Sequence, residues 1–209
     1  MAAGERWQLK KTVVLVGMMG AGKTAVGKAL AAILDVPFLD SDVEIEAAAN
    51  MKIPEIFARD GEAFFRDRET KVIDRLLDSQ RGILSAGGGA FLSERNRNLI
   101  GAKGVSVWLQ ADLRLLWGRV KHKDTRPLLR TADPYKTLKD LYEARLPYYE
   151  MADLAVPAHS SYTIDQMANK VCEALEQRTP RRRRRGSRGR GRPGARAPGS
   201  GPRAGHPSR

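Results

Sequence analysis

The sequence predicts an α/β fold in which a five-stranded parallel sheet is flanked by helices on both faces. Five short runs rich in β-branched residues and leucine alternate along the chain with longer stretches of helical period. Parallel strands need crossover connections, so this alternation favours a parallel sheet covered by helices. The chain of 209 residues is long enough for one such domain with a sizeable core and too short for two.

The first expected strand and helix enclose the most specific motif of the chain. Residues 12–16 are β-branched or leucine, and a helical pattern starts near Lys23. The segment that joins them fits the P-loop pattern and consists of Gly17, Met18, Met19, Gly20, Ala21, Gly22, Lys23 and Thr24. Glycines let backbone N–H groups approach phosphates, while Lys23 would add a mobile charge and Thr24 a hydroxyl ligand for magnesium. The motif predicts ATP or GTP binding with Mg²⁺; the alternative is a glycine-rich turn that binds nothing.

A second apolar run, residues 36–39, ends in the acidic turn Asp40-Ser41-Asp42. The carboxyl ends of parallel strands meet at one edge of a sheet, so both acids would face the same side as the P-loop. One acid could serve magnesium and the other a substrate. The alternative is that Asp42 caps the helix that follows, a role that we do not expect Asp40 to share.

Two expected helical regions follow the acidic turn. Residues 42–60 form a helix, a break at Ile53-Pro54 and a short helix over residues 55–59 that ends at Gly61, and a long helix then covers residues 62–79. Arg66 and Glu69 lie three residues apart near the start of the long helix, where an ion pair could fix the arginine as an anion clamp. A solvated charged face is the alternative.

A third apolar run, residues 82–86, leads into three consecutive glycines, Gly87, Gly88 and Gly89. Glycines at the carboxyl end of a strand favour close approach of the backbone to a ligand. A tight turn into a helix that starts at Ser93 would use glycines too, so both interpretations stay open.

The segment 121–133 is basic and poorly periodic, which is typical of a mobile lid. It follows a helix expected over residues 112–120, which carries Arg119 near its end, and it contains Arg126. Arg119, Arg126 and Arg130 could bring positive charge onto bound phosphates when the lid closes.

Two further strands, residues 105–109 and 153–156, complete the predicted sheet. The helical pattern over residues 134–151 carries Arg145. A closing helix begins at Thr163 with a capping-box pattern.

The net charge of +13 is concentrated at one end of the chain. Residues 180–209 hold 11 of the 37 Lys and Arg residues and none of the 24 acidic residues, which leaves residues 1–179 with a net charge of +2. We expect an N-terminal extension over residues 1–10, a P-loop domain over residues 11–178 and a disordered Arg/Gly/Pro-rich tail over residues 179–209. The tail could attract nucleic acid only non-specifically, because it has no aromatic stacking residue.

The expected compartment is the cytoplasm. The single cysteine, Cys172, cannot form an intramolecular disulfide and lies in a helical pattern, where a buried apolar role is expected. The chain has no run of about 18 apolar residues and no signal-peptide pattern at its start.

Five motifs in this order make the chain resemble the shikimate kinases, a family of P-loop small-molecule kinases, over residues 10–176. They are the P-loop, Asp40-Ser41-Asp42, Gly61-x-x-x-Phe65-Arg66-x-x-Glu69, Gly87-Gly88-Gly89 and Arg126-Pro127-Leu128-Leu129. The resemblance implies a P-loop kinase fold with a lid. It also implies ATP-dependent phosphorylation of the 3-hydroxyl of shikimate to shikimate 3-phosphate, a step of chorismate and aromatic amino acid biosynthesis.

The resemblance implies a set of roles around the nucleotide. The P-loop with Lys23 and Thr24 would hold ATP and Mg²⁺, and Asp40 would support the metal through its water shell. Arg119 would lie against the adenine, and Arg126 would reach the transferring phosphate from the lid.

A second set of implied roles concerns the acceptor. Asp42 would bind the substrate hydroxyls and accept the proton of the one phosphorylated, which makes it catalytic together with the lysine and the lid arginine. Arg66 and Arg145 would hold the shikimate carboxylate, and the Gly88 backbone would contact the ring hydroxyls. The expected partners are shikimate and ATP, with no membrane, and the expected state is a monomer. Alternatives are another small-molecule P-loop kinase, such as gluconate kinase, or a nucleotide-binding module that its basic tail tethers to nucleic acid.

Overall fold

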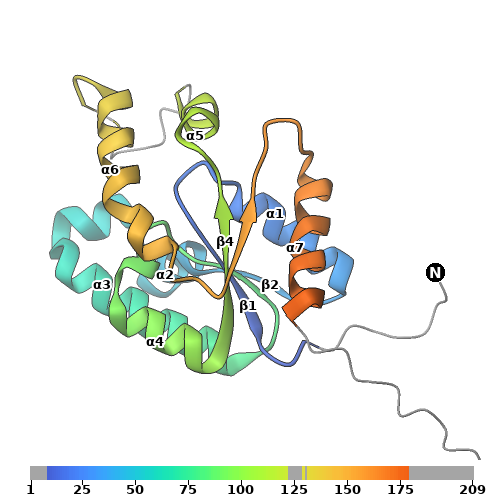
Figure 1. The fold of residues 1–209 in the computed structure, drawn as a ribbon. Helices are drawn as coiled ribbons and strands as arrows, with labels where there is room; N and C mark the ends of the chain where they lie inside the picture. Colours follow the sequence, from blue (N-terminus) through green and yellow to red (C-terminus); the bar gives the residue numbers. More distant parts are fainter. Residues whose placement is uncertain (1–8, 122–128, 130, 179–209) are drawn as a thin grey trace, which may run out of the picture. The chain divides into compact units, whose positions relative to one another are not determined.

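The five expected strands form one parallel sheet in the order β2-β3-β1-β4-β5 (Figure 1). The computed structural model describes residues 9–121, 129 and 131–178. The strands are β1 (Thr12–Val16), β2 (Phe38–Asp40), β3 (Ile83–Ser85), β4 (Gly104–Gln110) and β5 (Leu154–Pro157). The predicted α/β fold with a parallel sheet is therefore confirmed.

Helices cover both faces of the sheet. Helices α1 and α7 pack against each other on one face, while α3 and α4 lie together on the other (Figure 1). The helices are α1 (Lys23–Leu34), α2 (Ser41–Ala49), α3 (Ile53–Ser79), α4 (Glu94–Lys103), α5 (Leu113–Val120), α6 (Pro134–Tyr149) and α7 (Ile164–Arg178), with a short 3₁₀ helix η1 (Ala90–Leu92) before α4.

Strand β1 occupies the centre of the sheet because all of its side chains are apolar or small. Each of its residues is buried, and Val14 pairs with Leu84 of β3 on one side and Ser106 of β4 on the other. A continuous apolar run suits a strand with helices on both faces, where no side chain points to water. The carboxyl end of this central strand therefore fixes where the P-loop begins.

The second strand and its acidic turn differ from the expectation. Strand β2 begins at Phe38 and not at residue 36, since Pro37 has no backbone N–H to donate. The Pro37 carbonyl accepts a hydrogen bond from Ile83 N at 2.9 Å. Asp40 is the N-cap of α2, and its Oδ1 accepts a hydrogen bond from the Asp42 backbone N–H at 3.1 Å. Asp42 lies inside the first turn of α2. The expectation that Asp40 does not cap, and the alternative that Asp42 does, are both wrong.

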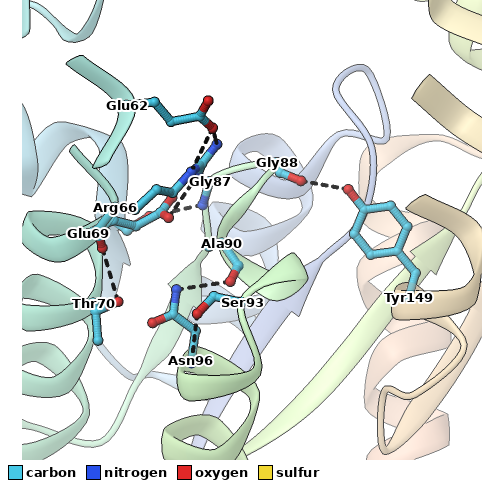
Figure 2. A network of polar contacts seen from close by, with 11 residues as sticks. Glu62, Arg66, Glu69, Thr70, Gly87, Gly88, Ala90, Ser93, Asn96 and Tyr149 are labelled. Carbon is cyan, nitrogen blue, oxygen red and sulfur yellow. Dashed lines mark hydrogen bonds and ion pairs between the residues drawn. The ribbon is translucent and has the colours of Figure 1, made fainter. Parts of the chain in front are cut away.

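Several helix boundaries follow the predicted signals. Gly61 breaks α3 with a non-helical backbone (φ 81°, ψ 173°), at the border between the two expected helices. Ser93 caps α4 by accepting from Asn96 N at 3.4 Å, and Thr163 exchanges two hydrogen bonds with Gln166 at the start of α7, as the capping box predicts. Helix η1 was not expected; buried Asn96 supports it by donating from Nδ2 to the Ala90 carbonyl at 2.9 Å (Figure 2).

Parts of the expected domain organisation lie outside the described residues. These parts are residues 1–8, most of the predicted lid and the tail from residue 179 onward. Of the lid, Leu129 is described and packs into the core. Cys172 is half-buried against the core, and burial raises the pKa of its thiol, so it fits the expected packing role. Within the described ranges, no helix combines the length and apolarity that a membrane crossing requires.

We predict that Gly27→Ala lowers the free energy of unfolding by about 1–3 kcal/mol, although alanine is the better helix former. Gly27 lies in α1, where an added Cβ would be 2.6 Å from Phe38 Cε2 and 3.2 Å from Leu15 Cδ1. Gly101→Ala in α4 is the control, because an added Cβ there meets nothing within 4 Å. Urea denaturation should show that the control is unchanged or more stable by up to about 1 kcal/mol. Equal effects of the two changes would contradict this packing.

Candidate active site

The P-loop wraps around a cavity at the carboxyl edge of the sheet. Gly17, Gly20 and Gly22 have positive φ angles of 137°, 82° and 96°, which side chains other than glycine rarely allow. Gly22 is also the N-cap of α1, so the backbone N–H groups of the first helical turn lie at the same loop. This is the backbone geometry that binds phosphate, as the sequence predicts.

Polar side chains from three elements meet beside the P-loop. Lys23 Nζ lies 2.8 Å from the Gly17 carbonyl oxygen, so its charge sits within the loop. Thr24 Oγ1 donates to Asp40 Oδ2 at 3.0 Å and lies 3.5 Å from Ser85 Oγ. Ser85 ends β3 and was not singled out in the sequence, because a lone serine in an apolar run carries no motif. The hydroxyl and carboxylate oxygens form the hard donor set that Mg²⁺ prefers.

The P-loop cavity has a volume of about 610 Å³ and reaches from Thr24 to the loop between β5 and α7. Arg119 lines it and donates from Nη1 to the Gly20 and Ala21 carbonyls, both at 3.2 Å. The far wall includes His159 and Tyr162, whose rings meet edge to face at 5.0 Å. Sequence reasoning missed this wall, because only the fold brings the β5–α7 loop next to the P-loop.

A second cavity of about 790 Å³ adjoins the first. Both cavities are lined by Met19, Asp42 and Gly88, so these three residues mark the place where they meet. One wall of the second cavity is apolar and is formed by Ile53, Pro54, Phe57 and Phe65. The other side carries the remaining predicted substrate residues, Arg66 and Arg145.

Two glutamates hold Arg66 at the second cavity (Figure 2). Its Nη1 donates to Glu69 Oε2 at 2.9 Å, and its Nε and Nη2 lie 3.3 Å and 3.2 Å from the single Glu62 oxygen Oε1. Burial raises the pKa of Glu69, which is 1% exposed, and the charge and hydrogen bond of Arg66 oppose this shift. The predicted pair is present, and each partner needs the other because the carboxylate is desolvated.

The three glycines after β3 leave room for the protein's own side chains. An added Cβ on Gly87 would lie 2.6 Å from Asp42 Oδ1, and one on Gly89 would lie 2.7 Å from both terminal nitrogens of Arg66. Gly88 is more open, with Arg145 Nη1 at 3.8 Å from its added Cβ. The glycines thus permit a close approach, and the groups that approach are the candidate substrate-binding side chains themselves.

The structure brings the predicted site residues to one edge of the sheet, apart from Arg126, which lies outside the described residues. The shikimate kinase family model matches residues 19–176, which is well over half of the chain. The chain belongs to the shikimate kinase family. It has shikimate kinase activity, a phosphotransfer from ATP in the shikimate pathway.

Individual relatives support the family membership. A shikimate kinase of Ruegeria pomeroyi is 67% identical over 170 residues, which cover 81% of this chain and 87% of the relative. A structure of the shikimate kinase from Acinetobacter baumannii in complex with shikimate is 36% identical, with a TM-score of 0.76 over 81% of this chain and 94% of that one. A gluconokinase from Sinorhizobium meliloti is 16% identical with a TM-score of 0.53 over 80% of this chain and 92% of that one, a likeness that shows the fold alone.

We predict that Gly89→Ala raises KM for shikimate about five- to thirty-fold, because the added methyl group displaces the Arg66 guanidinium. Gly89 has a helical backbone (φ −99°, ψ −10°), so alanine adds little backbone strain. The atoms that the added Cβ meets belong to the far end of the flexible Arg66 side chain. Steady-state kinetics should show KM for ATP within about two-fold of the unaltered protein. Gly101→Ala serves as the control and should change neither constant. An unchanged KM for shikimate would mean that Arg66 need not occupy its present position.

Proposed function

We propose that the P-loop cavity binds ATP, that the adjoining cavity binds shikimate, and that the 3-hydroxyl is phosphorylated where the two meet. The observation that carries this proposal is the shared boundary of Met19, Asp42 and Gly88 between a phosphate-binding loop and a cavity with two arginines. A hydroxyl placed at this boundary would face both Asp42 and the end of the phosphate chain. Such placement supplies the in-line approach that phosphoryl transfer requires.

The nucleotide half is assigned to the P-loop and the surfaces beside it. Backbone N–H groups from Gly17 to Thr24 would hold the β- and γ-phosphates, with the positive end of α1 behind them. Lys23 would turn from the loop carbonyls to the phosphates when these enter, because a phosphate outcompetes a neutral carbonyl for a cation. Arg119 and Tyr162 both line this cavity, which supports the adenine contact expected of Arg119.

The donor set at the foot of the P-loop fits a magnesium ion held jointly with the phosphates. Thr24 would ligate it directly, and Asp40 and Ser85 would bind its water shell. The ion would neutralise negative charge on the β- and γ-phosphates. Among the residues that the structure describes, no group of three or more His, Cys, Asp or Glu side chains is arranged to hold a metal ion.

The acceptor half is suited to a small carboxylate with several hydroxyls. The Nε–Nη2 edge of Arg66 is the edge that forms two parallel bonds to a carboxylate, and one oxygen of Glu62 now bridges it. The Glu62 side chain is 67% exposed and can withdraw into water at little cost, whereas buried Glu69 keeps its hold on Nη1. The shikimate carboxylate would replace Glu62 on this edge and take a second contact from Arg145. Backbone groups of Gly88 would meet the ring hydroxyls.

Asp42 is proposed to orient the 3-hydroxyl and to accept its proton late in the transfer. The side chain lines both cavities, and the hydrogen bond from its backbone N–H to Asp40 fixes the turn that presents it. The transition state of phosphoryl transfer is loose and charge spreads over the equatorial oxygens, so positive groups contribute mainly by electrostatics. Lys23 would supply one such charge. Arg126 from the predicted lid would supply a second, and lid closure would keep water from competing as the acceptor.

Several expectations stay predictions beside this assignment. They are the disordered tail over residues 179–209 with only non-specific attraction to nucleic acid, the monomeric state and the cytoplasmic location. A tethered nucleotide-binding module would need the tail for its function, whereas the proposed kinase site uses residues from 17 to 162.

We predict that Arg145→Lys mainly changes KM for shikimate and that Asp42→Asn mainly changes kcat. Arg145→Lys should raise KM for shikimate about ten- to a hundred-fold with little change in KM for ATP, because a lysine point charge cannot replace a guanidinium fork. Asp42→Asn should keep ATP binding and lose kcat, since an amide of the same size cannot accept the hydroxyl proton. Coupled ADP-release kinetics measure both constants.

The matched control is Arg95→Lys, which makes the same exchange at a 66% exposed side chain of α4. It should leave both Michaelis constants unchanged. If Arg145→Lys and Asp42→Asn show the parent's shikimate kinetics, the acceptor half of the assignment is wrong.

A further inference from the structure

Tyr149 is a buried side chain that the proposed chemistry does not use. It is the last residue of α6, is 1% exposed and lies four residues, about one helical turn, after Arg145. Its hydroxyl donates to the Gly88 carbonyl at 2.6 Å, as Figure 2 shows. A buried tyrosine usually finds a partner for its hydroxyl, but here the partner belongs to the glycine loop that lines both cavities.

The Tyr149 ring is fixed from the sheet side. It stacks on Trp108 of β4 with ring centroids 6.2 Å apart and an interplanar angle of 21°. Trp108 in turn packs on the first residue of the P-loop, because an added Cβ on Gly17 would lie 3.3 Å from Trp108 Cδ1. The ring position is therefore set by the central sheet and does not depend on the hydroxyl.

Arg145 lies beside the same glycine loop, because its Nη1 would be 3.8 Å from an added Cβ on Gly88. Burial raises the pKa of Tyr149, and Arg145 opposes this shift through its charge and a hydrogen bond to the phenol. The hydroxyl consequently keeps its proton at neutral pH and donates it to the Gly88 carbonyl, while its oxygen remains an acceptor for the guanidinium.

The bond to Gly88 sets the orientation of one peptide plane in the acceptor cavity. The carbonyl of residue 88 and the N–H of Gly89 belong to the same trans peptide and point in opposite directions. Holding the carbonyl toward α6 therefore turns the Gly89 N–H away from α6. Without this bond the plane could rotate, since neither glycine has a side chain to restrict it.

We propose that Tyr149 is a positioning residue for the acceptor, which fixes Arg145 and the Gly88–Gly89 peptide in the arrangement that receives shikimate. This inference rests on the assignment of the second cavity to shikimate. Tyr149 is not among the residues that line the two cavities, whereas Gly88, Gly89 and Arg145 line the second one. The tyrosine would act by removing alternative orientations of these lining groups, so that the acceptor meets a preorganised site.

The test is Tyr149→Phe, which keeps the ring on Trp108 and removes only the hydroxyl. KM for shikimate should rise about five- to thirty-fold, while KM for ATP changes less than about two-fold, because the nucleotide half does not depend on this bond. The matched control is Tyr148→Phe. Tyr148 is 39% exposed, its ring faces Arg97 at 5.3 Å, and removal of its hydroxyl should leave both constants unchanged.

A double variant, Tyr149→Phe with Arg145→Lys, distinguishes positioning of Arg145 by the hydroxyl from a general loss of order in the protein. If the hydroxyl acts through Arg145, the two losses in kcat/KM should be less than additive, so the double variant is close to Arg145→Lys alone. The proposal is overturned if Tyr149→Phe leaves KM for shikimate unchanged, or if both Michaelis constants rise together with a fall in thermal stability. Failure of the assigned acceptor site would look different, because Arg145→Lys alone would then leave KM for shikimate unchanged.

Discussion

The acceptor side of the active site depends on the absence of side chains where β3 ends. Gly87 makes room for Asp42 and Gly89 for Arg66, at separations where an added Cβ would collide at 2.6 Å and 2.7 Å. Between them, the Gly88 carbonyl receives the Tyr149 hydroxyl. Three helices, α2, α3 and α6, thereby deliver polar groups to one loop. Residues other than glycine at these positions would place a Cβ where the polar groups of the three helices now approach the backbone.

The parallel sheet explains why the two cavities, which we propose bind the nucleotide and the acceptor, meet at one boundary. Every strand of the described sheet points the same way, so the segments after β1, β2 and β3 leave the sheet at one edge (Figure 1). The P-loop, the Asp40–Asp42 turn and the glycine loop are those three segments. The charge of Arg66 is balanced at the same edge. The desolvated Glu69 holds the guanidinium through Nη1, whereas the Nε–Nη2 edge bonds to Glu62, an exposed carboxylate that another carboxylate can replace. A site with this layout can exchange an exposed glutamate for a substrate carboxylate without losing the arginine.

Features with local causes could be predicted from the sequence, and features that depend on tertiary placement could not. The P-loop, the Thr163 capping box and the Arg66–Glu69 pair follow from spacing within a few residues, and all are present. The cap at Asp40 was missed because the choice of cap depends on where α2 starts, and a sequence leaves that uncertain by a residue or two. The contact of the Tyr149 hydroxyl with Gly88 could not be predicted from the sequence. A tyrosine in an amphipathic helix normally packs in the core, and only the fold shows which loop its hydroxyl reaches. For the same reason the sequence did not predict that residues 158–163 contribute to the wall of the P-loop cavity.

The central claim is that Arg145, together with Arg66, holds the carboxylate of shikimate. The most direct measurement compares kcat/KM for shikimate and for its methyl ester, which keeps the hydroxyls and lacks the negative charge, in the unaltered protein and in Arg145→Ala. We expect esterification to lower kcat/KM about ten- to a hundred-fold in the unaltered protein and by a smaller factor in the variant, where only the contact with Arg66 is left to lose. An equal loss on esterification in both proteins would show that Arg145 does not bind the carboxylate and would contradict the account.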